Sequence, residues 1–414
     1  MSGKKSIDHS TMREMNLALI LDTLRIHAPI ARSTLSNLTG LNKVTVSSLV
    51  KELLDRELVR ELGVDTSSSD IGRPAINLEL NPDAGFIIGA EIGVDFLSVI
   101  LTNFSAEILA RRYESTRHLT SMDSILNRMV TLLRETYREV NRGHGNILGI
   151  GLGLPGLVEV SNGSLIFSPN LGWRDVPVGE ILNQELNVPI FIDNEANMAA
   201  LGESYFGAGM NKEYVLFISV GVGLGGGIVL HEKLLPGMSG FAGEIGHMTM
   251  QPDGYKCNCG NSGCWETLVS QRAVFRSIKE QITSGNISLL SAMTTGDLDR
   301  LTIPMVVKAA DQKDEVALKA LHDLGRWLGI GMANLINILN PERIVFGGIL
   351  SLAHEHILPV AYEELSNRAL EWSQQSCDIV IATHGKDSCV MGGIATVFRQ
   401  ILRQPTYWTT GSSS

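Results

Sequence analysis

The sequence predicts an α/β protein with a small N-terminal head and a body of two lobes. The chain has 414 residues, of which 44% are hydrophobic and 19% charged, so it has the composition of a globular protein but is too long for one core. Short helical patterns fill the first 60 residues. From about residue 85, strand runs that end in glycine-rich turns alternate with helical segments. We therefore expect a head over 1–82, lobes over 83–200 and 201–400, and a disordered tail over 401–414.

The head begins with three segments of helical periodicity. Apolar residues recur at helical spacing over 13–27, a second short helix is expected to open with Ser33 as its N-cap and to end at Gly40, and a third segment spans 42–56 with Asn42 as its N-cap. Three short helices with a glycine turn before the third are typical of a helix-turn-helix, whose last helix enters the major groove of DNA.

The two faces of the third segment differ in polarity. Its inward face is expected to carry Val44, Leu49, Leu53 and Leu54. The residues left for the outer face, where bases and phosphates would be contacted, are Lys43, Thr45, Ser47, Ser48 and Lys51.

Two strand-prone runs, 58–62 and 76–80, flank a polar loop. This pattern predicts a β-hairpin beside the helices, the wing of a winged helix-turn-helix. Arg73 stands between glycine and proline in the loop, where an arginine could enter a narrow minor groove. The same stretch also fits an ordinary polar turn.

Charge is divided unevenly along the chain. Residues 1–60 carry nine Lys/Arg and six Asp/Glu, a net +3, which leaves −13 for the remainder of the total −10. A basic head on an acidic body is compatible with nucleic-acid binding. No apolar run reaches the roughly 18 residues of a membrane helix, and no signal peptide opens the chain. Five cysteines, an odd number, argue against a disulfide framework. We expect a cytoplasmic protein.

The body alternates between strands and helices. Strand–glycine–strand units recur near residues 87, 148, 214 and 343, and residues 86–114 are typical of a β-meander. The helical stretches of the body are 121–140, 176–186, 196–206, 266–282 and 315–339.

The stretch 243–266, GEIGHMTMQPDGYKCNCGNSGCWE, contains a candidate metal site. His247, Cys257, Cys259 and Cys264 follow the spacing H-x9-C-x-C-x4-C, with glycines that let the chain turn between them. Such ligands suit tetrahedral Zn²⁺, and four protein ligands make the metal structural. Free buried thiols are the alternative.

Two carboxylates accompany this cluster. Glu244 lies three residues before His247, which places both on one helical turn, and Glu266 follows the last cysteine. A pair of carboxylates with a fixed imidazole is suited to hydrogen-bonding neighbouring sugar hydroxyls.

These motifs resemble the ROK family, which comprises repressors, open-reading-frame proteins and sugar kinases. The resemblance rests on LGLPGLV (152–158), SVGVGLGGGIVL (219–230) and the cysteine segment, while SPNLGW (168–173) and DNEAN (193–197) are similar to the xylose-repressor branch. It implies a two-lobed actin-like ATPase/sugar-kinase fold behind a winged helix. It also implies that sugar is held by Asn170, Asn194, Glu195, Glu244, His247 and Glu266.

The loops that ROK kinases use for nucleotide depart from the family pattern here. The family's Asp-x-Gly-Gly-Thr corresponds to Glu91-Ile92-Gly93-Val94-Asp95, and the second loop lacks its threonine. The family's catalytic Asp after Asn is Glu195. A branched side chain and an added carboxylate disfavour phosphate, so we expect no enzyme activity.

The resulting expectation is a repressor that binds double-stranded operator DNA, as a homodimer or tetramer, and releases it on binding an aldose such as xylose or glucose. Two alternatives stay open. One is a sugar kinase with an appended DNA head, and the other is a repressor controlled by a protein partner.

Overall fold

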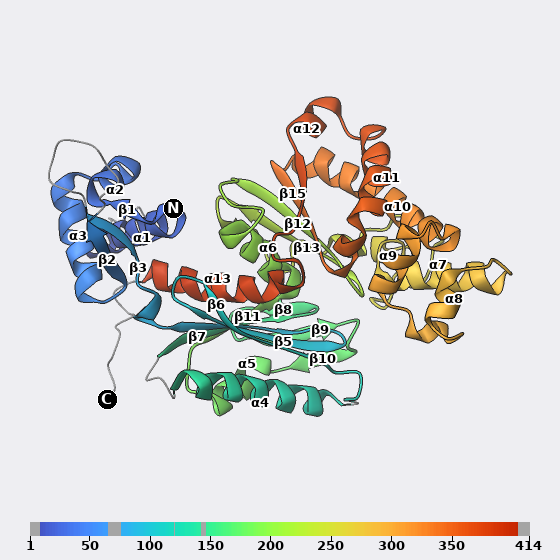
Figure 1. The fold of residues 1–414 in the computed structure, drawn as a ribbon, viewed down its shortest axis with the longest axis horizontal. Helices are drawn as coiled ribbons and strands as arrows, with labels where there is room; N and C mark the ends of the chain where they lie inside the picture. Colours follow the sequence, from blue (N-terminus) through green and yellow to red (C-terminus); the bar gives the residue numbers. More distant parts are fainter. Residues whose placement is uncertain (1–8, 65–75, 120, 142–145, 405–414) are drawn as a thin grey trace.

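The computed structural model describes residues 9–64, 76–119, 121–141 and 146–404. These residues form a head and two lobes, each lobe built on a five-stranded sheet (Figure 1). None of the described helices is long and apolar enough to cross a membrane.

The head is a helix-turn-helix with a small antiparallel sheet, as predicted. Its helices are α1 (His9–His27), α2 (Arg32–Thr39) and α3 (Lys43–Asp55). Its sheet has the order β1-β3-β2 and consists of β1 (Ile30–Ala31), β2 (Val59–Val64) and β3 (Ile76–Leu80). The loop between β2 and β3, with Arg73 at the predicted wing tip, lies outside the described residues.

Two local predictions in the head are wrong. Helix α2 begins at Arg32 with Ala31 as its N-cap, so Ser33 lies inside the helix and does not cap it. In α3, Val44 does not face inward, because it is 82% exposed. Asn42 caps α3, as predicted, by accepting a hydrogen bond from the Thr45 amide. The buried stripe at i, i+3, i+4 and i+7 is Val46, Leu49, Val50 and Leu53.

The sheet of the first lobe has the order β11-β7-β4-β5-β6, in which the first three strands are parallel and the last two antiparallel. Its strands are β4 (Phe86–Ile92), β5 (Phe96–Asn103), β6 (Ile108–Ser115), β7 (Ile147–Leu154) and β11 (Ile190–Asn194). A smaller sheet contains β8 (Leu157–Glu159), β9 (Ser164–Ser168) and β10 (Trp173–Val176). Helices α4 (Met122–Asn141) and α5 (Val178–Glu185) cover one face of the large sheet (Figure 1).

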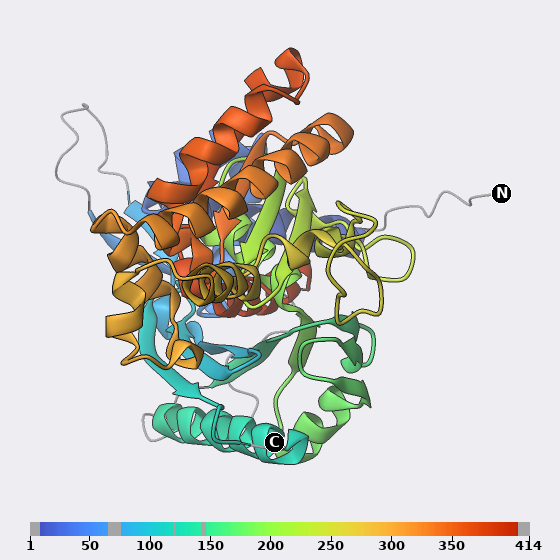
Figure 2. The ribbon, with the colours of Figure 1, turned by 90° about the vertical axis from the view of Figure 1, so that its right-hand side faces the viewer.

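The sheet of the second lobe has the order β14-β13-β12-β15-β16. Its strands are β12 (Tyr214–Val220), β13 (Leu224–Leu230), β14 (Lys233–Leu234), β15 (Arg343–Gly347) and β16 (Asp378–Ile381). Its helices are α7 (Gln271–Thr283), α8 (Leu289–Met293), α9 (Ile303–Asp311), α10 (Glu315–Leu339), α11 (His354–Ser366) and α12 (Glu371–Gln375). The long α10 and α11 pack side by side (Figure 2).

Two helices cross from one lobe to the other. Helix α6 (Glu195–Phe206) follows the last strand of the first sheet but packs against β12 and β13 of the second. Helix α13 (Ser388–Arg403) ends the described chain but packs against β4 and β7 of the first sheet. A single division at residue 200 therefore does not describe the packing, and the helix continues to Arg403, beyond the predicted start of the tail.

The head and the first lobe share one hydrophobic core. Leu17 and Leu24 of α1 belong to the same buried cluster as Phe104 and as Phe398 and Ile401 of α13. Burial of a leucine or phenylalanine side chain contributes roughly 1.5 to 3 kcal/mol, so several such contacts hold the head firmly on the body.

Candidate functional site

A cavity of about 300 Å³ opens between the two lobes. Loops of the first lobe after β7 and β9 form one wall, and the β12–β13 turn and the segment from 243 to 266 form the other. All six residues predicted to hold a sugar line this cavity: Asn170, Asn194, Glu195, Glu244, His247 and Glu266.

The end of β11 and the start of α6 place two of these residues. The Asn194 side-chain oxygen caps α6 by accepting from the amides of Ala196 and Asn197 at 2.8 and 3.3 Å. Its amide group donates to the Gly156 carbonyl at 2.8 Å. These bonds fix Asn194 and set Glu195 as the first residue of the helix, facing the cavity.

Gly223 has no side chain, which leaves room for polar groups of Glu266 and Asn170 in the cavity wall. A Cβ at Gly223 would lie 2.7 Å from Glu266 Oε2 and 2.9 Å from Asn170 Nδ2. The turn between β12 and β13 therefore needs a bare backbone at this point, because any side chain would displace two groups of the cavity wall.

Three carboxyl groups share this small space. The pKa of Glu195 rises to about 7 because the surrounding protein removes it from water and because Glu244 and Glu266 add negative charge. Burial also raises the pKa of Glu244, an effect opposed by His247, whose Nε2 lies 3.7 Å from Glu244 Oε2. A carboxyl group with a pKa near neutrality, such as Glu195, can donate a hydrogen bond to a sugar oxygen when protonated and accept one from a sugar hydroxyl when ionised.

Three residues at or beside this cavity were not predicted from the sequence. Arg272 and Asn258 of the second lobe donate to Asn170 Oδ1 of the first at 2.9 and 3.2 Å, which ties the lobes together beside the cavity. Ser168 lines the cavity, is fully buried, and its Oγ has no hydrogen-bond partner among the described residues. A buried hydroxyl without a partner points to a polar ligand or water. Only the SPNLGW motif could have drawn attention to Ser168.

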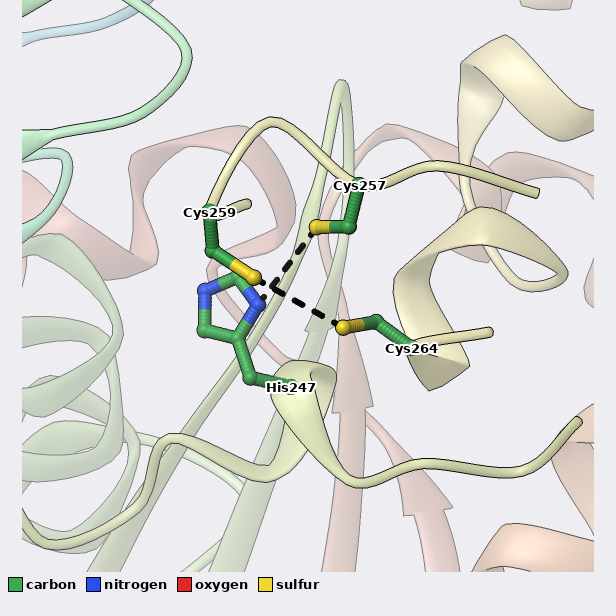
Figure 3. A group of neighbouring side chains, drawn as sticks. All are labelled: His247, Cys257, Cys259 and Cys264. Atoms are coloured by element: carbon green, nitrogen blue, oxygen red, sulfur yellow. Dashed lines mark hydrogen bonds between the residues drawn. The ribbon is translucent and has the colours of Figure 1, made fainter. Parts of the chain in front are cut away.

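The four predicted metal ligands converge at the edge of the cavity (Figure 3). Their ligand atoms all lie within 4.8 Å of one another. His247 Nδ1 is 3.7 Å from Cys257 Sγ, and Cys259 Sγ is 3.7 Å from Cys264 Sγ. The cluster can hold a metal ion, and its geometry supports that use.

The same imidazole serves the cluster and the cavity. Nδ1 of His247 faces the sulfur atoms, while Nε2 faces Glu244. The Cys257 thiol also donates to Glu266 Oε1 at 2.9 Å, and burial together with that carboxylate raises the pKa of this thiol. Any change in the cluster therefore acts on two residues of the cavity wall.

Comparison of the sequence with known protein families identifies its family, because the ROK family model matches residues 87–400. The chain belongs to the ROK family. Among its ROK relatives, the xylose repressor of Caldicellulosiruptor bescii is 34% identical over 400 residues, which cover 97% of this chain and 99% of the relative.

The solved structures that are similar to this chain include both ROK regulators and ROK kinases. The crystal structure of a ROK family transcriptional regulator, a homologue of the Escherichia coli MLC protein, matches 97% of this chain and 100% of its own with a TM-score of 0.81 and 27% identity. A ROK glucokinase from Streptomyces griseus, in complex with glucose and AMPPNP, matches 76% of this chain and 100% of its own, with a TM-score of 0.69 and 30% identity. The two-lobed fold is thus shared by both classes, whereas the first match extends over the head as well.

Charged neighbours surround residues 91–95, the segment expected from the sequence to correspond to the kinase phosphate loop. Glu91, at the end of β4, is buried, and its pKa rises to about 8 because of that burial and the nearby Glu195 charge. Asp95 pairs with Arg117 at 2.8 Å. The charge of Asp95, which was expected to repel a nucleotide, is therefore partly neutralised by Arg117, a neighbour that the sequence alone did not reveal.

Proposed function

We propose that this chain is a sugar-responsive transcriptional repressor that acts in the cytoplasm on operator DNA. In this proposal an aldose such as xylose or glucose fills the cavity between the lobes and favours release of the DNA. The proposal rests on one observation, that a helix-turn-helix head and a polar cavity occur in the same chain. A helix-turn-helix head shares its core with a lobe whose six cavity residues offer carboxylate, amide and imidazole groups to a polyol.

On the DNA side, α3 is the proposed recognition helix. Ser47, Ser48 and Lys51 are exposed and Thr45 is half-buried, and Lys43 is exposed at the N-terminus of the helix, the part that meets base edges in such motifs. Arg73 of the wing is proposed to reach the minor groove. A single head offers few contacts, so we propose a homodimer, or a tetramer built from dimers, on a palindromic site.

We further propose that the cluster of His247, Cys257, Cys259 and Cys264 holds a structural Zn²⁺. Tetrahedral zinc bonds of about 2.0 to 2.3 Å to nitrogen and sulfur place neighbouring ligand atoms roughly 3.5 to 3.8 Å apart, which agrees with the 3.7 Å separations. With four protein ligands the ion has no open position for substrate, so its role is to fix the cavity wall.

The chain is proposed not to act as a kinase. A Glu91 that stays protonated lacks the charge with which a carboxylate binds Mg²⁺. Glu195, with a pKa of about 7, has the acidity of a general base, so a sugar kinase with a DNA head is the second candidate. A repressor controlled by a protein partner is the third. ADP release with sugars would favour the second, and DNA release by cell extract but by no sugar would favour the third.

The test is operator binding by the full chain, measured by fluorescence anisotropy at a stated salt concentration with DNA from upstream of its own gene. Each aldose is added in turn. Specific binding that one aldose weakens supports the proposal. Specific binding that no aldose changes rejects sugar control, and absence of specific binding rejects the repressor.

A further inference from the structure

The head lies across the boundary between the two lobes. On one side, α1 packs along α13, and both contribute to one buried cluster. Because α13 packs on the sheet of the first lobe, this contact fixes the head to that lobe. In Figure 1 the head lies at one end of α13, and the first sheet lies beneath the helix.

On the other side, the head meets α6 and the β13–β14 turn of the second lobe. Helix α6 packs on β12 and β13. Its first residue, Glu195, lines the cavity, and its last two, Tyr205 and Phe206, lie among residues that pack with the head. Twelve residues of α-helix span about 18 Å. A single rigid element therefore reaches from the cavity to the head.

Arg25, on α1, makes this second contact. Its Nη1 donates to the Tyr205 carbonyl at 2.6 Å, and its guanidinium lies 4.4 Å from the centre of the Tyr205 ring. Its Nη2 lies 3.7 Å from Glu232 Oε1 in the β13–β14 turn, and Asp22 of the same helix accepts from its Nε at 2.8 Å. The side chain is only 6% exposed, so these bonds are shielded from water and ions.

The boundary that the head spans is built of closely approaching backbones. A Cβ at Gly202 of α6 would lie 2.6 Å from the Gly392 amide of α13, and one at Gly392 would lie 1.6 Å from the Met198 carbonyl. Because neither glycine has a side chain, no side chain at these two positions interlocks the helices. Small sliding of such packed helices is one way in which lobes close around a ligand.

We propose that Arg25 is a positioning residue that couples the cavity to the DNA-binding head. When the lobes close on a sugar, α6 and the β13–β14 turn shift relative to α13, and Arg25 transmits this shift to α1 and thus to α3. Without Arg25 the head would keep only apolar contacts to α6 and would follow the first lobe more closely. This inference rests on the proposed function, since it names how that sugar site is connected to DNA release.

The test compares Arg25→Met and Glu232→Gln with Arg13→Met in the full chain. Arg13 is the matched control because it lies on α1 and pairs with Glu52 inside the head, so its loss removes the same charge without breaking a contact to the body. For each protein, three quantities are measured: sugar affinity by calorimetry, operator affinity without sugar, and the ratio of operator affinities without and with saturating aldose. Couplings of this kind are typically about 5- to 150-fold.

We expect Arg25→Met to lower that ratio about tenfold and Glu232→Gln about threefold, with sugar affinity and sugar-free operator affinity within about twofold of wild type. Arg13→Met should keep the wild-type ratio, although it weakens operator binding. A wild-type ratio in both Arg25→Met and Glu232→Gln would overturn the proposal. Should Arg25→Met fail to fold, Glu232→Gln decides, because that side chain is 46% exposed. A wild-type protein that binds operator but responds to no aldose would reject the proposed function and, with it, this coupling.

Discussion

Replacing Glu91 by glutamine should flatten the pH dependence of stability between about pH 5 and 7.5. The pKa of Glu91 is about 8 in the folded chain against an ordinary 4.5, so the folded state holds a proton that the unfolded state releases. The stability that this proton contributes is complete below pH 4.5 and is lost as the pH rises toward 8.

Each pH step of one across this interval costs about 1.4 kcal/mol, so the wild type should lose about 3 kcal/mol between pH 5 and 7.5 through Glu91. Glutamine has the same shape and no titration, so the variant should escape this loss. For a lobe of this size, a difference of about 3 kcal/mol corresponds to a relative change of about 5 to 10 °C in Tm.

The assay is Tm by circular dichroism at half-unit pH steps and constant ionic strength. The control is Glu180→Gln, which removes an exposed carboxylate on α5 and should run parallel to wild type. Parallel curves for Glu91→Gln and wild type would refute the reasoning, because they would mean that Glu91 is ionised throughout. Glu195, with its pKa raised to about 7, lowers wild-type and variant stability in the same direction, so the difference between the curves reports Glu91 together with its interaction with Glu195.

Three further predictions concern the cluster, the cavity and the head. Cys259→Ala should lose bound metal and weaken sugar binding about tenfold or more, because His247 is no longer held in position. Calorimetry measures the sugar affinity, metal analysis measures the bound ion, and Cys377→Ala is the control outside the cluster. Unchanged sugar affinity in the metal-free variant would reject the dependence of sugar binding on the metal. Ser168→Ala should weaken sugar binding about three- to tenfold without changing sugar-free operator binding, because Oγ has no partner among the described residues and would bond to the sugar once closure of the lobes moves the cavity wall. Equal affinity would mean that Oγ makes no contact with the sugar. Val44, exposed on the recognition helix, should contact a thymine methyl group. Replacing operator thymines one at a time by deoxyuridine should then weaken the operator affinity of the wild type about threefold or more at one position, and should leave the affinity of Val44→Ala unchanged. Equal losses of affinity in both proteins would exclude that contact.

Local patterns were enough to predict the helices of the head and α4, α5, α6, α7 and α10 of the body, whereas α8, α9, α11, α12 and α13 were not predicted. Asp314 caps α10 and Asn340 ends it in a left-handed conformation, so the predicted range 315–339 agrees with the observed helix. The metal cluster was also predictable, since three of its four ligands lie within eight positions and the glycines between them allow the turns. Val44 was misplaced although the Asn42 cap was predicted, because the cap fixes where the helix begins, whereas the buried face is fixed by the stripe of Val46, Leu49, Val50 and Leu53.

What the sequence did not reveal depends on contacts between distant residues. Arg25 and Tyr205 are 180 positions apart, and Arg272 and Asn170 are 102 apart. Neither pair belongs to a periodic pattern, so only the fold brings them together. The crossing of α6 and α13 between the lobes is of the same kind, because each helix has an ordinary amphipathic or apolar sequence whose partner sheet is set by topology.

The measurement that tests the central claim most directly is the operator affinity of the full chain with and without a panel of aldoses at fixed salt. The account predicts specific binding to DNA upstream of its own gene, in the nanomolar range typical of such complexes, weakened about tenfold or more by one aldose. Specific binding that is equal with and without every aldose, or phosphorylation of a sugar without specific DNA binding, would contradict it.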